Sequence, residues 1–396
     1  MAKKRTVGIV CECNPFHAGH EYLIRSARES GADVIVCVMS GLFVQRGEAA
    51  VADPYLRAEA VIRGGADLVI ELPFPYAASG AETFAAAGVD ILDRVGVDEL
   101  WFGSECGDLA VLREAARICE MPVFTERYVA SVGESRGTAQ AFFEILSELA
   151  GKELSLSSND ILAISYLRAL NARTSHILPV TVKREGSAYR ESGLSDEGYP
   201  SASALRALWR REGTVAVLPH LPSVCRKTYA ALEAPADLAY AERLILGYFR
   251  LADPDALELV AELSGGLGNR LSQASVRART LSELLTLAAT KKYPIARLQR
   301  GILFALTSIG AEELHAPAAY TRLLAANSRG RAYLAERRRS MRITVVTRRT
   351  ELPECEEARR QEAWEARAWS LWTLCHPTAD GADQLWRHVP RMVEET

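Results

Sequence analysis

The sequence predicts an α/β fold in which a doubly wound parallel sheet is followed by a mainly helical domain. Short apolar runs alternate with helix-length segments in the first half of the chain, as in βαβ units. From about residue 219 long amphipathic segments replace this alternation. The length of 396 residues suits two or three domains, on a prior of about 150 residues each. We therefore expect a Rossmann-like sheet domain over residues 1–215 and a helical domain over residues 216–396.

The expected strands are continuous apolar runs rich in β-branched residues, a pattern typical of parallel strands covered on both faces. They are Val7–Cys11, Val34–Met39, Asp67–Glu71, Glu99–Phe102 and Leu178–Val182. The segments between the first four have the length of crossover helices, and glycines follow most of their ends. The expected helices are Gly19–Ser30, Pro54–Gly64, Ser79–Val95 and Leu109–Cys119. We expect the strand order 3-2-1-4-5, in which the first and fourth strands are neighbours.

The second half of the chain contains amphipathic segments and one short β-rich run. The expected helices include Ala236–Phe249, Pro254–Leu263 and Ala296–Thr307. The run Arg342–Thr347 is either an isolated strand or a return to the first domain's sheet, and the sequence leaves both open.

The composition is that of a soluble globular protein, with 48% hydrophobic and 24% charged residues. Eight cysteines are scattered without a repeated CxxC unit, so neither a zinc ribbon nor a disulfide framework is expected. The apolar stretch after the basic start ends at Glu12 and is too short for a signal sequence or a membrane span. We therefore expect a cytoplasmic protein with no membrane partner and no protein-bound metal.

The small net charge of −3 conceals a strongly basic region. Residues 265–349 contain sixteen lysines and arginines and four acidic residues, a balance of +12 that leaves −15 for the rest of the chain. Such a segment is typical of proteins that contact a phosphate backbone. The alternative for any single cation is a solvated helix surface.

One motif carries the chemistry. His17-Ala-Gly-His20 lies between the first expected strand and the next helix, where free N–H groups and the helix dipole favour anions. Two imidazoles there can hold a triphosphate and stabilise charge as pyrophosphate leaves, and Gly19 lets the backbone approach the phosphates. The alternatives are packed or solvent-facing histidines and a metal site, but no nearby Cys/His set completes the latter. His-x-Gly-His in this position is typical of nucleotidylyltransferases.

Other residues are expected at the same edge of the sheet. Gly103 ends the fourth strand opposite the histidine turn, where it either lets an adenosine ring pass or forms an ordinary strand-end turn. Lys183-Arg184 follows the fifth strand. The segment Pro200–Arg206 is similar to a second nucleotidylyltransferase element, in which a serine and an arginine bind the β- and γ-phosphates.

The sequence resembles the bacterial tRNA(Met) cytidine acetate ligase family between about residues 5 and 350. The motifs that carry the resemblance are collinear: Gly8–His20, Met39–Glu48, Gly65–Phe74, Phe102–Glu105, Ser158–Leu162, and Lys291-Lys-Tyr293 with Arg297 and Arg300. Residues beyond about 350 are not covered, and the spacing of Trp364, Trp369 and Trp372 there predicts a docking or packing face.

The resemblance implies a two-step reaction. Acetate attacks the α-phosphate of ATP to give acetyl-adenylate, and the acetyl group then passes to N4 of the wobble cytidine in elongator tRNA(Met). His17 and His20 are the implied catalytic residues, and ATP enters with Mg²⁺. The implied ATP-binding residues are Val10, Cys11, Glu12, Cys13, Asn14, Pro15, Phe16, His17, Ala18, Gly19, His20, Glu21, Tyr22, Leu23, Gly103, Asn159 and Arg184. The implied tRNA-binding residues are Lys291, Lys292, Arg297 and Arg300.

The reaction fits the available side chains. Acetate is already ionised at pH 7, because its carboxyl pKa is roughly 4 to 5, so the first step needs positioning and cations but no general base. In the second step the cytosine amine is a poor nucleophile, and Glu105 or Asp160 could accept its proton.

The sequence departs from the family at two places. Cys11 and Cys13 stand where the family more often has other residues, and we expect them to pack as small hydrophobes. Ser158-Asn159-Asp160 stands where Pro-Asn-Asn is usual, which leaves the shape of this loop open.

Two other functions compete with this interpretation. A small-metabolite adenylyltransferase would share the histidine turn, although such enzymes are compact and need no basic helical domain. A tRNA-binding protein with a vestigial nucleotide site would not bind ATP.

Overall fold

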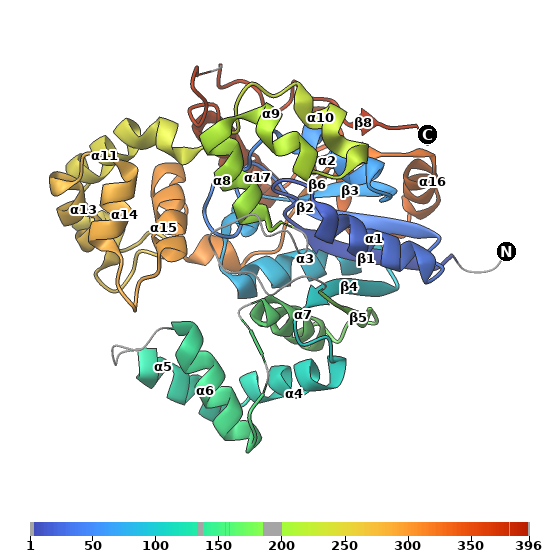
Figure 1. The fold of residues 1–396 in the computed structure, drawn as a ribbon, viewed down its shortest axis with the longest axis horizontal. Coiled ribbons are helices and arrows are strands. Elements are labelled where there is room, and N and C mark those ends of the chain that lie inside the picture. The colour runs from blue at the N-terminus through green and yellow to red at the C-terminus, as the bar shows by residue number, and fades with distance from the viewer. Residues whose placement is uncertain are drawn as a thin grey trace.

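The computed structural model describes residues 4–132, 138–154, 156–157, 159–184, 200–379 and 381–394. In this part of the chain one sheet contains eight strands, with helices packed on both of its faces (Figure 1). The strands are β1 (Thr6–Cys11), β2 (Val34–Ser40), β3 (Leu68–Leu72), β4 (Glu99–Ser104), β5 (Leu178–Lys183), β6 (Tyr320–Ala326), β7 (Thr344–Val346) and β8 (Arg391–Met392).

The order of the sheet is β5-β4-β1-β2-β3-β6-β7, with β8 paired to β6. The first five strands are parallel, which confirms the five expected strands and their order. Because successive side chains of a strand point to opposite faces, the central strands supply two cores. Ile35 and Cys37 of β2 belong to the core on one face, and Val34 and Val36 to the core on the other.

The four expected crossover helices are present within two residues of their expected ends. The helices of the first half are α1 (Ala18–Glu29), α2 (Pro54–Arg63), η1 (Tyr76–Ala78), α3 (Ala81–Val95), α4 (Leu109–Cys119), α5 (Pro122–Val132), α6 (Thr138–Ala150) and α7 (Asp160–Ala172). Helices α5, α6 and α7 lie between α4 and β5, where no element was predicted. Of these, α7 packs against α3 beside the sheet, whereas α5 and α6 pair with each other farther out (Figure 1).

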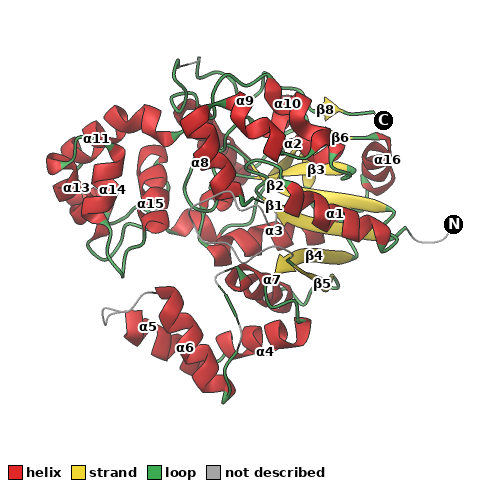
Figure 2. Ribbon diagram, in the orientation of Figure 1, coloured by secondary structure: helices red, strands yellow, loops and turns green. Residues whose placement is uncertain are grey.

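The second half is mostly helical, as expected (Figure 2). Its helices are α8 (Ala202–Glu212), α9 (Thr214–Val217), η2 (Leu218–His220), η3 (Ser223–Cys225), α10 (Arg226–Ala230), η4 (Leu238–Ala241), α11 (Glu242–Leu251), α12 (Pro254–Leu257), α13 (Leu267–Arg277), α14 (Leu281–Ala288), α15 (Ile295–Thr307), η5 (Glu312–His315), α16 (Ser328–Arg337), η6 (Arg349–Glu351) and α17 (Glu356–Trp372).

The expectation of a helix over Pro254–Leu263 was wrong beyond α12. Glu262 has a φ of 68°, which a helix cannot contain, and Val260 pairs with Gly310 as an isolated β-bridge. This turn places Glu262 beside α15, where it meets two arginines described below.

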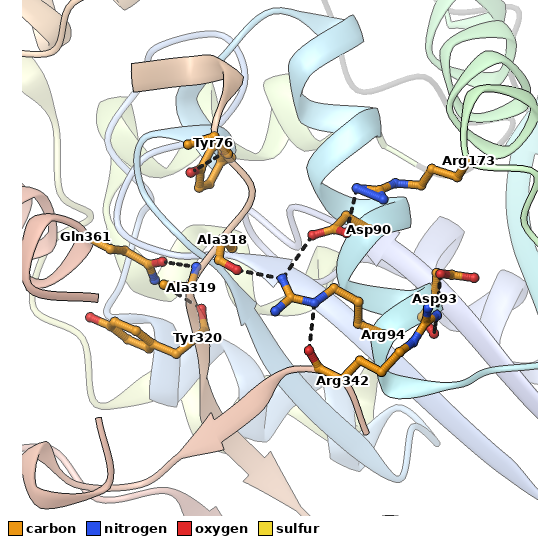
Figure 3. Close-up of polar contacts among 11 residues, drawn as sticks. Tyr76, Asp90, Asp93, Arg94, Arg173, Ala318, Ala319, Tyr320, Arg342 and Gln361 are labelled. Atoms are coloured by element: carbon orange, nitrogen blue, oxygen red, sulfur yellow. Dashed lines mark hydrogen bonds and ion pairs between the residues drawn. The ribbon is translucent and has the colours of Figure 1, made fainter. Parts of the chain in front are cut away.

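Strand β6 brings the second half of the chain back to the sheet, antiparallel to β3. Arg94 of α3 fixes its approach by donating hydrogen bonds to the carbonyls of Ala318, at 2.6 Å, and Arg342, at 3.0 Å (Figure 3). From the other side Gln361 of α17 donates to the Tyr320 carbonyl at 3.1 Å. The approach to β6 is therefore held from both sides.

This return settles the open question about Arg342–Thr347, because β7 lies within that run and joins the sheet by pairing with β6. It also means that residues 216–396 are not helical throughout, since they contribute β6, β7 and β8. The division at residue 215 remains a prediction. The C-terminal tryptophans Trp364, Trp369 and Trp372 are buried, so this face of α17 is a packing face.

Candidate active site

The histidine turn lies at the carboxyl end of β1 and begins α1. His17 is the N-cap of the helix, and its Nδ1 accepts a hydrogen bond from the Gly19 N–H at 3.0 Å. In return, Nδ1 of His20 accepts from the His17 N–H at 3.3 Å. The two histidines thus form a reciprocal capping box, with ring centroids 3.9 Å apart.

This arrangement determines which ring nitrogen carries the proton. A neutral imidazole that accepts at Nδ1 must carry its hydrogen on Nε2. Burial, aided by the neighbouring cations Arg184 and Arg206, holds the pKa of His17 well below its usual value. Burial likewise lowers the pKa of His20 to about 4. Both rings are therefore neutral at pH 7 and offer Nε2–H donors at the N-terminus of α1.

Hydrogen bonds to distant segments fix the loop that precedes the histidines. The side-chain oxygen of Asn14 accepts from the Val51 N–H at 2.8 Å, and its carbonyl accepts from Arg206 at 2.9 Å. The Phe16 N–H donates to the Tyr229 hydroxyl at 3.1 Å. The turn is therefore pre-organised by contacts from three separate segments.

Sequence reasoning missed Arg57 of α2, which braces the same loops. Its fully buried guanidinium donates to the carbonyls of Glu12, at 2.7 Å, and Ser40, at 2.8 Å, and also bonds the carbonyls of Ala52 and Gly41. A buried charge is costly unless it is fully hydrogen-bonded. Arg57 therefore ties the loop after β1 to the loop after β2. An arginine on the apolar face of α2, beside Ala58 and Val61, was the available signal.

Gly103 and Arg184 meet at the ends of β4 and β5, as their positions in the sequence predicted. The Arg184 N–H donates to the Ser104 carbonyl at 3.0 Å, and its stem crosses Gly103. A Cβ added at Gly103 would lie 3.2 Å from Cγ of Arg184. Any larger residue at this position would therefore force the Arg184 side chain to shift. Arg184 also lowers the pKa of both His17 and His20, which places its charge beside the turn.

The predicted site residue Asn159 lies next to the loop after β4 and donates a hydrogen bond to Glu105. Asp160 is buried and accepts hydrogen bonds from the N–H groups of Glu105, at 2.9 Å, Cys106, at 3.3 Å, and Ser157, at 2.8 Å. The Asp160 carboxylate therefore holds the loop after β4 and the loop before α7 together. Ser158, the departure noted in the sequence, lies outside the described residues.

The remaining residues of the predicted ATP segment are divided between core and surface. Cys11, Cys13, Pro15 and Phe16 are buried. Val10 at the end of β1, and Glu21, Tyr22 and Leu23 on α1, are partly buried. All eight cysteines of the chain are free thiols.

Arg206 connects the turn to the loop after β2. It lies in the first turns of α8, whose N-cap is Ser201, as the similarity to a phosphate-binding element predicted. Besides its bond to Asn14, its Nε lies 2.9 Å from Glu48. Glu48 also lies 3.8 Å from Arg210, which is paired in turn with Asp237.

The four predicted tRNA-binding cations differ in their surroundings. Lys291 and Lys292 are exposed, and in the described residues neither forms an ion pair. Arg297 and Arg300 are partly buried and both contact Glu262, at 3.5 and 2.7 Å. Tyr293 lies between two cations, 5.2 Å from Lys292 and 5.3 Å from Arg297.

Several other arginines of the basic region are also paired within the fold. They include Arg322 with Glu71 at 2.8 Å, Arg342 with Asp93 at 2.6 Å and Arg349 with Glu362 at 2.7 Å. The balance of +12 therefore overstates the charge that this region leaves free for a partner.

In the described part of the chain, no group of three or more His, Cys, Asp or Glu side chains is placed to hold a metal ion. Over the same residues no helix combines the length and apolarity needed to cross a membrane.

Comparisons with known proteins agree with this geometry. A family model described as HIGH Nucleotidyl Transferase matches residues 4–384. A tRNA(Met) cytidine acetate ligase of Syntrophotalea carbinolica is 36% identical over 358 residues, which cover 87% of this chain and 84% of that protein. One of Caldicellulosiruptor bescii is 33% identical over 341 residues, covering 83% and 84%.

Similarity extends to the three-dimensional structure. The crystal structure of Thermotoga maritima TmcAL bound with alpha-thio ATP superimposes with a TM-score of 0.88 and 27% sequence identity, covering 99% of this chain and all of that one. The apo form of TmcAL gives the same TM-score at 26% identity. These matches continue past residue 350, where the resemblance in the sequence was expected to end.

Proposed function

Because this chain belongs to the tRNA(Met) cytidine acetate ligase family, we propose that its two parts divide one reaction. The protein is an ATP-dependent ligase, and the histidine turn activates acetate while the helical part holds the tRNA. The pair of neutral Nε2–H donors of His17 and His20 at the N-terminus of α1 carries the proposal. Such donors lose little free energy to reorganisation as negative charge develops on the departing pyrophosphate.

In the first step, acetate attacks the α-phosphate of ATP and the bond to pyrophosphate breaks. Acetate needs no base, because it is ionised at pH 7. It does need relief from the repulsion between two anions, which the helix N-terminus and the charges of Arg184 and Arg206 supply. The product is acetyl-adenylate, and pyrophosphate leaves.

We assign ATP to the segment Val10–Leu23 together with Gly103, Asn159 and Arg184. We assign the adenosine to the space over Gly103, where an added Cβ would lie 3.2 Å from Cγ of Arg184 and would narrow it. Magnesium travels with the phosphates of ATP, where it neutralises charge, rather than on a cage of protein ligands.

In the second step, the N4 amine of the wobble cytidine attacks the acetyl carbonyl, AMP leaves, and a base takes the proton from N4. Of the two carboxylates considered from the sequence, we favour Glu105, because Asp160 already accepts several hydrogen bonds.

For tRNA binding we assign Lys291 and Lys292 to direct phosphate contacts. Arg297 and Arg300 contribute through the guanidinium N–H groups that Glu262 does not occupy. The reaction is placed in the cytoplasm, where tRNA is modified.

Of the two competing functions, no observation favours a small-metabolite adenylyltransferase, and the family assignment extends through the helical half. The histidine turn is intact, because the N–H groups of Gly19 and His17 donate to Nδ1 of His17 and Nδ1 of His20. This disfavours a vestigial nucleotide site.

The proposed function is tested by two assays on the wild-type protein. We expect acetate-dependent exchange of pyrophosphate into ATP without tRNA, and transfer of acetyl groups to tRNA(Met) when tRNA is added. Mass spectrometry should find N4-acetylcytidine in the product. Absence of exchange with acetate, or exchange with a phosphorylated metabolite instead, would refute the assignment.

A further inference from the structure

The loop after β2 forms a short hairpin that presents one arginine to solvent. The Val44 N–H donates to the Glu48 carbonyl at 3.1 Å, and the Gly47 N–H donates to the Val44 carbonyl at 2.8 Å. Gly47 has a φ of 74°, the left-handed conformation that a three-residue hairpin loop requires at its last position. Arg46 therefore lies at the tip of a turn whose backbone is fixed.

Arg46 differs from the residues around it in both exposure and partners. Within the described residues 34–62 it is the one exposed residue, and the hairpin residues Phe43 and Ala49 are buried. Over the part of the chain that the structure describes, its guanidinium forms no hydrogen bond and no ion pair. By contrast, Arg57 and Arg206 are buried and donate to backbone carbonyls. The donors of Arg46 are therefore available to a ligand.

Two contacts place the hairpin between the histidine turn and α15. On one side, the Gln45 N–H donates at 2.8 Å to Oε1 of Glu12, in the loop before the histidines. On the other side, a Cβ added at Gly47 would lie 2.5 Å from the backbone nitrogen of Arg300, so the hairpin and the helix meet at their backbones. Arg46 lies between these two contacts in the chain. It therefore lies at the boundary between the ATP site and the cations assigned to tRNA.

The assigned tRNA contacts lead along α15 to this boundary. Lys291 and Lys292 precede the helix, and Arg300 lies on its second turn, about 7.5 Å along the axis from the first residue. An RNA strand that runs from these cations to the histidine turn passes the tip of the hairpin. Arg46 is thus placed to meet the part of the RNA that enters the active site.

A phosphate of the RNA suits Arg46 better than acetate does. An exposed ion pair between small groups contributes little, so a lone arginine in water does not hold free acetate in place. The same arginine adds affinity for a polyanion that is already held elsewhere, because each neutralised phosphate releases counterions. A guanidinium group also matches two phosphate oxygens with parallel N–H donors.

We propose, on the basis of the proposed function, that Arg46 binds a backbone phosphate next to the wobble cytidine and so positions this nucleotide over the histidine turn. The order of the sheet gives the nucleotide a suitable span. Strands β2 and β4 are two strand spacings apart, or roughly 10 Å, with β1 between them. A nucleotide whose phosphate lies at Arg46 extends its base across β1 toward Glu105, which follows β4. Arg46 is therefore a positioning residue for the second step and takes no part in the first.

The first test separates the two steps. Arg46→Ala should lower kcat/KM for acetyl transfer to tRNA about tenfold and reduce the slope of log K against log salt for tRNA binding by about one. Acetate-dependent ATP–pyrophosphate exchange without tRNA should stay within about twofold of wild type. Arg46→Lys should restore part of the transfer, because it keeps the charge but loses the paired donors. Arg113→Ala on α4 removes an equally exposed charge and should retain both activities.

The second test identifies the phosphate. Transfer RNA with an uncharged methylphosphonate linkage next to the wobble cytidine should bind wild type about tenfold more weakly than unmodified tRNA does. Arg46→Ala should bind the two RNAs equally, because the contact with that phosphate is already lost. In Lys292→Ala the linkage should still weaken binding about tenfold, because this lysine is assigned to a different phosphate.

The outcomes distinguish the role of Arg46 from the proposed function. If wild-type protein transfers no acetyl group to tRNA, the proposed function fails and the assignment of Arg46 with it. If wild type transfers acetyl and Arg46→Ala does so equally well, or if the linkage weakens binding equally in both proteins, only the assignment of Arg46 is overturned. A higher KM for acetate in the exchange reaction of Arg46→Ala would also overturn it, because Arg46 would then contact acetate.

Discussion

The histidine turn and the basic segment of residues 265–349 show two different relations between sequence and site. At the turn, the residues that bind each other lie within three positions, and the Nδ1 atoms of both histidines accept defined backbone hydrogen bonds. In the basic segment, the partners of the arginines come from far along the chain, as with Arg322 and Glu71 or Arg342 and Asp93. A short motif therefore specifies geometry, whereas a count of charges does not reveal which cations are free.

The two regions also differ in how they handle charge. Burial lowers the pKa of both imidazoles at the turn, so they are neutral at pH 7 and present N–H donors to an anion. The basic segment leaves full charges in water at Lys291 and Lys292. Pre-organised neutral donors suit a transition state, and exposed cations suit a mobile polyanion.

The largest expected effect is at His17. His17→Ala should reduce acetate-dependent ATP–pyrophosphate exchange by about 100-fold or more, because one pre-organised donor is lost, while tRNA binding measured by filter retention stays unchanged. His17→Asn is the control, since asparagine is a good N-cap and should preserve the start of α1. Exchange in His17→Ala within threefold of wild type would remove the imidazole from the mechanism.

The next effect concerns stability rather than catalysis. Arg300→Ala should lower the free energy of unfolding by about 2 kcal/mol, because it removes a charged hydrogen bond from the partly buried Glu262. Lys292→Ala, eight residues earlier and exposed, should change it by less than about 0.5 kcal/mol. Urea denaturation measures both, and equal values for the two variants would show that burial does not separate these cations.

A smaller effect is expected on RNA affinity. The double variant Lys291→Ala/Lys292→Ala should weaken tRNA binding about tenfold and lower the slope of log K against log salt by about two, one for each phosphate contact. Exchange without tRNA should not change. As a control of equal charge, Arg113→Ala/Arg117→Ala on α4 should leave tRNA binding intact. A similar loss in both double variants would indicate a diffuse electrostatic attraction.

The smallest effect is the pH dependence of stability. The folded state holds the pKa of His20 near 4, below the value of about 6.5 in the unfolded chain. The unfolded state therefore takes up a proton first, and stability falls as the pH drops from 7 toward 4. Between pH 7 and 5.5, wild type should lose about 1 kcal/mol more than His20→Asn in denaturant titrations. Identical losses would show that His20 titrates normally.

Much of the sheet could be predicted because its information is local. The runs that form β1 to β5 are apolar and bounded by turns, so their type follows from the residues themselves. Strand β6 was missed because it contains Arg322, which is acceptable in a buried strand only when Glu71, about 250 residues earlier, neutralises it. No local pattern encodes that pairing.

The same distinction holds for the site. Sequence placed Gly103 and Arg184 beside the histidines, because strand order brings the carboxyl ends of neighbouring strands together. It did not identify Arg57, whose role depends on four carbonyls from other loops. It also could not tell that the Asp160 carboxylate accepts three backbone N–H bonds whereas that of Glu105 accepts one bond from Asn159, since both depend on how two loops fold against each other.

The late arrival of β6 has a consequence for the growing chain on the ribosome. The free edge of β3 is covered only when Tyr320–Ala326 has been made, about 250 residues after β3 itself, or roughly 12 to 50 s at ordinary synthesis rates. During that interval the nascent protein exposes an unpaired strand edge, which is a template for aggregation. Production of this enzyme should therefore depend on the speed of translation and on chaperones that shield the edge.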